Sequence, residues 1–401
     1  MTLWQRPTLR ALPTLVGILC SLAVTGCLSP VTLNRAVTAY DEAVTDAISK
    51  QLLINIARAH KHQPIHFTGV SNIAATFDFR VSAGATPALT GDASKALMPI
   101  FGGSVAENPT FSISPIEGEE FTKRLLTPFQ ESKFLHLLRQ GYDIDLLLRL
   151  MAQELRTAEN GQEVAYRNVP ADRKGYEMFR RVVTHLSAIQ DQNQLFAEPL
   201  TYYRTWTIPA GSVTGEGFHA LQKEYFVTYN QKENSYTLRK QIAGQIHITN
   251  YDPNTLSPEE RARLIDETEE GQLSDVSFDI RPKHVGGEFP LKGVFRLRSF
   301  NTILNFLGRS LEEDPEYHVD EDPRTPPVLE NPVYTMELLL SDGSPSIADL
   351  SIQYHGKYYS VNTTGPLARW NREAFQMLYL LFQMTVSEVP RVGVPSITIA
   401  K

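Results

Sequence analysis

The sequence predicts an α+β fold: a long N-terminal helix, a central helical hairpin, and a C-terminal, mostly antiparallel β region with two or three packed helices. Three observations support this prediction. Apolar residues recur every three or four positions between Leu33 and His60, with no Pro or Gly. Leu-rich runs follow helix-capping signals in the middle of the chain. From Thr201 onward the apolar period changes to two, which is typical of strands.

Length and composition divide the chain into four parts. It has 401 residues, of which 42% are hydrophobic and 21% charged, so most of it can bury a core. We expect a signal peptide over 1–26, and then a tether, long helix and short strands over 27–115. A helical segment over 116–197 and a β-rich α+β domain over 198–401 complete the prediction.

The N-terminal half predicts one helix followed by strands. The helix over 33–60 ends in basic residues before Pro64, which suits the helix dipole and stops the helix. Residues 65–82 alternate in character and predict one or two strands. The Gly-, Ala- and Ser-rich stretch 83–108 predicts a loop, and 111–116 a short strand.

Three helices are expected in the central segment. Thr127-Pro128-Phe129-Gln130 has the pattern of a capping box and predicts a helix that runs to Gln140 and is closed by Gly141. Asp143 is a predicted N-cap for a Leu-rich helix over 144–156. A third helix is predicted over 176–189.

The C-terminal part alternates strands with a few helices. A capping box at Ser257, with closure at Gly271, predicts one helix; a cap at Ser299 or Asn301 predicts a second, stopped by Gly308. A third helix is expected over 367–388. His355-Gly356 predicts a two-residue hairpin turn. The predicted strands are 201–208, 224–229, 236–242, 245–249, 276–281, 293–298, 335–340, 350–354, 358–361 and 396–400.

Charge argues against a nucleic-acid partner. The chain has 38 Lys and Arg against 45 Asp and Glu, a formal charge of −7. Proteins that bind polyanions normally carry a basic excess. We therefore expect no nucleic-acid partner.

The first 27 residues have the organisation of a secretory signal. Arg6 and Arg10 precede an apolar run from Leu12 to Thr25, which is too short to span a bilayer as a helix. The run ends in Val24-Thr25-Gly26-Cys27, which resembles the lipobox of bacterial lipoproteins. An ordinary cleaved signal peptide followed by a chance cysteine is the alternative.

The lipobox resemblance implies a processing route. Cleavage would follow Gly26, and Cys27 would become the N-terminus and carry diacylglycerol and fatty acyl chains such as palmitate. Leu28 at the next position would direct the protein to the outer membrane. The mature chain would have 375 residues and a charge of −9, from 36 basic and 45 acidic residues. It would contain no free thiol, which excludes cysteine nucleophiles, thiolate metal sites and redox pairs.

Three histidines, His60, His62 and His66, form a candidate metal site in the sequence HKHQPIH. Imidazole binds zinc and copper well. However, Pro64 interrupts the helix, so the three do not share a helical face, and Lys61 adds a positive charge. The alternative is a basic helix end that faces solvent or phospholipid head groups.

Arg296 and Arg298 form a candidate anion site, because alternate residues of a strand share a face and a helix is expected to begin at Ser299. Two surface arginines that pair with the acidic excess are the alternative. The run 311–322 holds seven acids in its last eleven residues, without the spacing of a calcium loop, so we interpret it as a solvated acidic loop. Aromatic residues in the strands could stack on sugars or bases, but cross-strand pairing explains them more simply.

No catalytic signature stands out. The sequence lacks G-x-S-x-G, a Walker loop, H-E-x-x-H and G-x-G-x-x-G, which favours a protein that is not an enzyme without closing the question. No cofactor is expected.

Three segments resemble an uncharacterised group of proteobacterial outer-membrane lipoproteins. They are QLLINIARAH (51–60), ISPIEGEEFTKRLLTPF (113–129) and LLRQGYDIDLLLRLM (137–151). The resemblance implies location and no catalytic residues.

The expected function is a lipid-anchored structural or interaction subunit on the periplasmic face of the outer membrane. Its partners would be the membrane, through the N-terminal lipid, and other envelope proteins. An envelope hydrolase that uses Asp, Glu or His, or a solute-binding lipoprotein, is the alternative, and the sequence leaves oligomerisation open.

Overall fold

The structure is a computed structural model that describes residues 28–87, 97–159, 161–266, 272–345 and 350–386. Helices and strands are mixed, with a large mixed sheet, so the predicted combination of α and β elements is confirmed at that level. The described residues divide into two compact units. The first comprises 28–52, 68–87 and 97–114, and the second comprises 53–67 and the described residues from 115 to 386.

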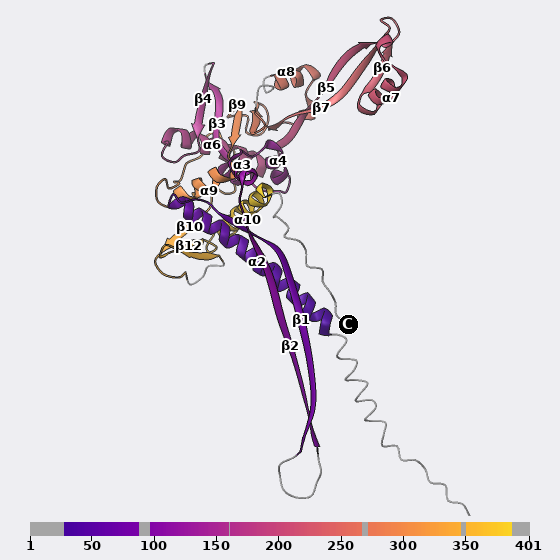
Figure 1. Ribbon diagram of the computed structural model, residues 1–401. Helices are drawn as coiled ribbons and strands as arrows, with labels where there is room; N and C mark the ends of the chain where they lie inside the picture. Colours follow the sequence, from indigo (N-terminus) through magenta and orange to yellow (C-terminus); the bar gives the residue numbers. More distant parts are fainter. Residues whose placement is uncertain (1–27, 88–96, 160, 267–271, 346–349, 387–401) are drawn as a thin grey trace, which may run out of the picture. The chain divides into compact units, whose positions relative to one another are not determined.

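A two-stranded sheet belongs to the first unit. Strand β1 (Phe67–Pro87) pairs with β2 (Leu97–Ile116), and helix α2 (Leu28–His60) begins in this unit and ends in the second (Figure 1). The loop predicted over 83–108 is therefore wrong over its described residues. Small residues have weak local preferences, and pairing with a neighbouring strand supplies the backbone hydrogen bonds that override them.

The second unit is built on a seven-stranded sheet. Neighbouring strands run antiparallel, except that β7 and β8 are parallel. The strand order is β4 (Gln162–Arg167), β3 (Ala152–Glu159), β9 (Leu291–Leu297), β8 (Asp275–Ile280), β7 (Ser235–Thr249) and β5 (Phe196–Pro209), with β6 (Phe226–Asn230) also paired to β7.

Two differences from the predicted strands have clear causes. The helix predicted over 144–156 ends at Met151, and the chain continues as β3 because Leu155 pairs with Phe295 of β9. The two strands predicted over 236–249 are the single strand β7, which passes through Gly244. A Cβ atom there would lie 2.8 Å from the carbonyl oxygen of Leu200, so the close approach of β5 requires glycine.

The predicted helix starts at Ser257 and Ser299 are confirmed, and the one at Thr127 is wrong. Ser257 and Glu260 form the reciprocal capping box, with bonds of 3.1 and 3.2 Å, and Ser299 Oγ accepts from the Thr302 amide at 3.2 Å. Thr127 instead follows a helix, and Pro128 forms a β-bridge with Ser299. The helices of this unit are α3 (Glu119–Leu126), α4 (Glu131–Leu138), α5 (Ile144–Met151), α6 (Arg173–Asp191), α7 (Gly215–Glu224), α8 (Pro258–Asp266), α9 (Phe300–Arg309) and α10 (Ala368–Thr385), with 3₁₀ turns at Ala210–Ser212 and Pro253–Thr255.

A smaller antiparallel sheet completes the second unit. Its order is β10 (Leu338–Ser341), β12 (Lys357–Val361) and β11 (Ser351–Tyr354). The predicted hairpin turn is confirmed: His355 and Gly356 have φ values of 49° and 79°, and Tyr354 pairs with Lys357.

Aromatic side chains form much of the core between the helices and the large sheet. Phe179 of α6 contacts Phe295 of β9 edge-on, with ring centroids 6.0 Å apart, and Phe278 of β8 lies 5.0 Å from the same ring. A second group stacks Phe67 on Phe382 of α10 at 4.5 Å. All of these side chains are buried.

Truncating Phe295 tests this core. We expect Phe295→Ala to lower the free energy of unfolding by about 3–5 kcal/mol, because the fully buried ring leaves a cavity between α6 and the sheet. Chemical denaturation would measure the loss. Phe226→Ala is the matched control: its ring is 72% exposed, so a change of about 0.5 kcal/mol or less is expected.

Candidate functional site

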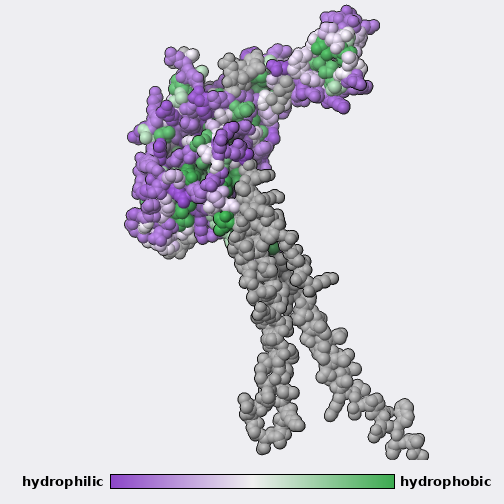
Figure 2. Space-filling model, in the orientation of Figure 1, coloured by the Kyte–Doolittle hydropathy of each residue, from purple (hydrophilic) through white to green (hydrophobic). Residues whose placement is uncertain are grey.

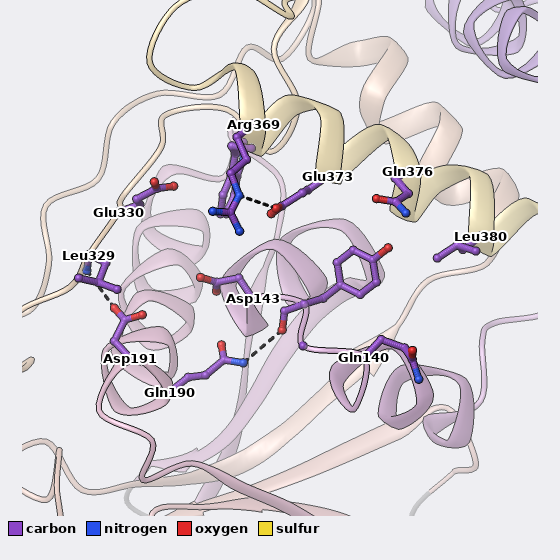
Figure 3. Close-up of a pocket in the computed structure, with 13 residues that line it drawn as sticks. Gln140, Asp143, Gln190, Asp191, Leu329, Glu330, Arg369, Glu373, Gln376 and Leu380 are labelled. Carbon is purple, nitrogen blue, oxygen red and sulfur yellow. Dashed lines mark hydrogen bonds and ion pairs between the residues drawn. The ribbon is translucent and has the colours of Figure 1, made fainter. Parts of the chain in front are cut away.

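A pocket of about 720 Å³ lies in the second unit between helices α4, α5, α6 and α10 (Figure 3). We call it the acidic pocket, because four carboxylates and one guanidinium line it. The lining residues are Gln140, Gly141, Tyr142, Asp143, Gln190, Asp191, Leu329, Glu330, Arg369, Trp370, Glu373, Gln376 and Leu380.

The end of α6 fixes the loop between α4 and α5. Gln190 accepts a hydrogen bond from the Ile144 amide at 2.7 Å and donates one to the Tyr142 carbonyl at 3.1 Å. The next residue, Asp191, accepts from the Leu329 amide at 2.9 Å and holds the opposite wall. Two consecutive side chains at the end of α6 therefore bind the backbone of two walls of the pocket.

Asp143 is the N-cap of α5, as predicted. Its Oδ1 accepts from the Asp145 amide at 2.7 Å and from Ser187 Oγ at 3.2 Å. Burial, together with the neighbouring charges of Asp145 and Asp191, raises its pKa to about 6, and these two hydrogen bonds act in the opposite direction. This carboxyl group can therefore take up or release a proton near neutral pH.

Helix α10 contributes the remaining charges. Arg369 Nε donates to Glu373 at 2.7 Å, so the one lining cation is paired within its own helix. Burial and the charge of Glu373 raise the pKa of Tyr142. The other three lining carboxylates, Asp143, Asp191 and Glu330, face no further lining cation. A positively charged ligand therefore suits this pocket better than an anion.

Behind the pocket lies a cluster of buried ions, which we call the buried ion network. Arg149 of α5 has no exposed surface and donates to Thr335 Oγ1 at 3.2 Å, to the carbonyls of Pro332 and Val333 at 2.9 and 2.8 Å, and to Glu316 at 3.3 Å. Asp145, one turn earlier on α5, lies 3.6 Å from the same guanidinium.

Glu316 is the centre of this network. It accepts from Tyr176 Oη at 3.0 Å and from the Thr335 amide and hydroxyl at 2.7 and 2.8 Å. Burial alone would raise its pKa, but Arg149 and Arg180 hold it below the ordinary value. Glu316 is therefore a buried carboxylate that stays charged.

Arg180 of α6 extends the network toward the pocket wall. It donates to Asn331 Oδ1 at 3.1 Å and to the Pro332 carbonyl at 3.0 Å. The segment 331–335, which both guanidiniums bind, directly follows the pocket residues Leu329 and Glu330. The network therefore positions one wall of the acidic pocket.

Arg298 adds a third buried guanidinium, satisfied by backbone. It donates to the carbonyls of Arg149, Leu150 and Asn168 at 3.1, 3.3 and 2.8 Å. Burial lowers its pKa to about 9, although Glu316 acts in the opposite direction. Arg296, two residues earlier, instead pairs with Asp275 at 3.3 Å. The structure thus engages the two arginines with different groups, and their predicted role toward an anion stays a prediction.

The three histidines of the predicted metal site also have separate partners. His60 is buried and contacts Tyr359 Oη at 3.0 Å and Glu312 at 2.9 Å. His62 pairs with Glu313 at 2.6 Å, and His66 uses its backbone to bind Asn55. In the part of the chain that the structure describes, no three His, Cys, Asp or Glu side chains gather as metal ligands. The lipidation site Cys27 and the cleavage site Gly26 lie outside the described residues.

The sequence does not reveal the network, and the prediction of a solvated loop over 311–322 is wrong for Glu316, which is buried beside Arg149 and Arg180. One available signal was Arg149 inside the apolar run Leu146–Met151, because a charge amid buried leucines requires a partner. The identity of that partner, 167 residues away, has no local signal.

Neutralising Glu316 tests the network. Glu316→Gln would remove the carboxylate that faces both buried guanidiniums and leave Arg149 with Asp145 alone, so we expect a loss of about 3–5 kcal/mol in unfolding free energy. Urea denaturation measures it. Glu313→Gln, from the same acidic run but 40% exposed, should change stability by about 0.5 kcal/mol or less. Equal losses in both variants would contradict the central role of Glu316.

The raised pKa of Asp143 predicts a pH effect. Because the folded state holds this proton more tightly than the unfolded chain, stability from this group is present below about pH 4 and is lost as the pH rises through about 6. Asp143→Asn keeps the cap and removes the charge. We expect it to unfold like the parent near pH 4 and to be more stable by about 1–2 kcal/mol near pH 7.5. Denaturation across this range measures the difference, and an Asp143→Asn variant no more stable than the parent near pH 7.5 would contradict the prediction.

Comparison with known proteins gives no match to this arrangement. No protein-family model matches the chain, no curated protein matches its sequence, and no solved structure matches its fold. Its function is therefore inferred from its own residues and their geometry.

Proposed function

We propose that this chain is a lipid-anchored envelope protein that acts as a structural or interaction subunit on the periplasmic face of the outer membrane. The observation that carries the proposal is the sequence Val24-Thr25-Gly26-Cys27 at the end of a short apolar run preceded by two arginines. In the described ranges, no helix is both long and apolar enough to cross a membrane.

The N-terminal helix would be the part of the protein next to the membrane. It has 33 residues and begins at Leu28, directly after the proposed lipidation site Cys27. Exposed positions such as Val37, which is 58% exposed, support a role for this helix in contacts with other proteins. We also propose that α4 and α5 form the predicted central helical hairpin.

Anchoring would act through local concentration. A single acyl chain binds a bilayer only marginally, while two or more anchor a protein stably, at about 0.8 kcal/mol per buried CH₂ group. A tethered protein meets partners in the same membrane at a much higher effective concentration than a free one. The role needs no catalytic group.

A solute-binding lipoprotein is the second candidate, and the acidic pocket favours it. The pocket has the volume of a small-molecule site and combines carboxylates with the rings of Tyr142 and Trp370. Asp143 also has a pKa suited to a general acid or base, which keeps a hydrolase using Asp, Glu or His as a third candidate.

Replacing Cys27 tests the anchor. In envelopes of a Gram-negative host, the parent chain should have lost residues 1–26, carry acyl groups on Cys27 and sediment with the outer membrane. Cys27→Ser should retain the signal segment and lack the lipid. Intact-mass spectrometry and membrane fractionation measure these outcomes, and a pull-down from solubilised envelopes measures partner recovery.

Cys20→Ser is the matched control, because this cysteine lies inside the apolar run and should leave processing unchanged. An unmodified Cys27 in the parent chain, or parent protein that is freely soluble inside the cell, would overturn the proposal. Recovery of the same partners by the parent and Cys27→Ser would remove any functional role for anchoring.

A further inference from the structure

Residues 201–241 form a lobe at one end of the large sheet, which we call the aromatic lobe. It contains β6, α7 and the adjoining parts of β5 and β7 (Figure 1). β7 is the middle strand, paired with β5 on one side and with β6 on the other. Figure 2 shows a group of hydrophobic residues on this lobe, surrounded by hydrophilic ones.

Helix α7 covers one face of this three-stranded sheet. Phe218 of α7 packs on Tyr236, with ring centroids 5.2 Å apart, and Leu238 in the same strand is buried. Residues directly opposite each other on paired strands share a face, so Ile208, Tyr236 and Tyr229 lie on the side of the helix. The aromatic residues of this face are explained by packing.

The opposite face carries exposed aromatic groups next to a cation. The row Thr205, Arg239 and Phe226 lies on this face, and the ring of Phe226 is 72% exposed. The guanidinium of Arg239 lies 3.7 Å from the ring centroid of Tyr203, which is itself 49% exposed. The neighbouring positions are Thr207, Thr228, Thr237 and Gln241. No carboxylate belongs to this set of positions.

Charge separates the aromatic lobe from the rest of the protein. Residues 201–241 contain five Lys and Arg against three Glu, a net charge of +2. The remaining residues contain 33 basic and 42 acidic side chains, a net charge of −9. A negatively charged partner is therefore attracted to the lobe and repelled by most of the remaining chain.

A second copy of the chain fits this open face poorly. Three strands spaced about 4.8 Å apart and about five residues long present only about 200–300 Å². A stable interface needs about 800 Å² from each partner. Pairing two such faces would also bring two Arg239 guanidiniums together without a carboxylate. A bilayer surface requires no such complementary patch.

We propose that the open face of the aromatic lobe binds the surface of an anionic phospholipid bilayer. Phe226 enters the boundary between head groups and acyl chains, Tyr203 lies at head-group level, and Arg239 binds lipid phosphate. Exposed aromatic rings beside cations are the combination that interfacial membrane binding uses. The lobe would supply a membrane contact that does not depend on the lipid at Cys27.

A fluorescent probe placed on the lobe tests the proposal. The chain from Leu28 to Lys401, which lacks the signal segment and both cysteines, would carry Phe226→Cys labelled with an environment-sensitive dye. With vesicles of phosphatidylethanolamine and phosphatidylglycerol, we expect blue-shifted emission and an intensity increase of about twofold or more, weakened by salt. Vesicles of phosphatidylcholine alone should give little response. Adding Arg239→Gln should lower the apparent affinity about fivefold.

Leu273→Cys is the matched control, because this side chain is 67% exposed outside the lobe. Arg309→Gln, 59% exposed in its own ion pair, controls for the loss of any surface arginine. A probe at 226 that responds no more than one at 273, or equally to both vesicle types, would overturn the proposal. If the emission of the dye at position 226 changes when unlabelled chain is added without vesicles, the open face binds a second copy of the chain instead. Since every chain lacks Cys27, none of these outcomes depends on lipid anchoring.

Discussion

The second unit depends on keeping a carboxylate charged in its interior. Glu316 has almost no access to water, and removing such a charge from water costs several kcal/mol unless hydrogen bonds and opposite charges replace the solvent. Arg149, Arg180, Tyr176 and Thr335 provide them, from α5, α6 and the segment before β10. Few other arrangements of α5, α6 and this segment would bring all of these groups to Glu316. The network therefore constrains how these three parts of the chain pack together.

The acidic pocket follows from that constraint. Both buried arginines bind the backbone of Pro332 and Val333, and the preceding residues form the pocket wall. Arg149 also lies 5.7 Å from the ring of Trp370, a pocket residue whose indole nitrogen donates to the Thr335 carbonyl at 3.1 Å. The wall therefore rests on a rigid support, which is what a preformed ligand site requires. Unlike the buried ions behind the wall, the Asp143 carboxyl group changes its charge near neutral pH, because its pKa is raised to about 6.

Acidic and basic surfaces are segregated in this protein, and the proposals use that segregation in different ways. The pocket carries four carboxylates and one guanidinium, while the aromatic lobe carries +2 within a chain of −7. A lipid on Cys27 would hold the chain at a membrane regardless of either surface. A weak second contact through Phe226 and Arg239 would add to that anchor, as two membrane signals commonly do, and would limit the orientations available to partners.

Local chemistry in the sequence determined the features that depend on neighbouring residues: the turn at His355 and Gly356, the helix starts at Ser257 and Ser299, and the alternating strands such as β8 and β12. The large sheet as a whole, and every partner distant in sequence, was decided by tertiary structure. Residues 152–156 favour a helix locally, yet they form β3 because β9 offers a ladder of hydrogen bonds about 140 residues later. Glu316 belongs to an acidic run that resembles a solvated loop. Only the packing of α5 against α6 places two guanidiniums beside it, and burial with paired charges cannot be deduced from one segment of the chain.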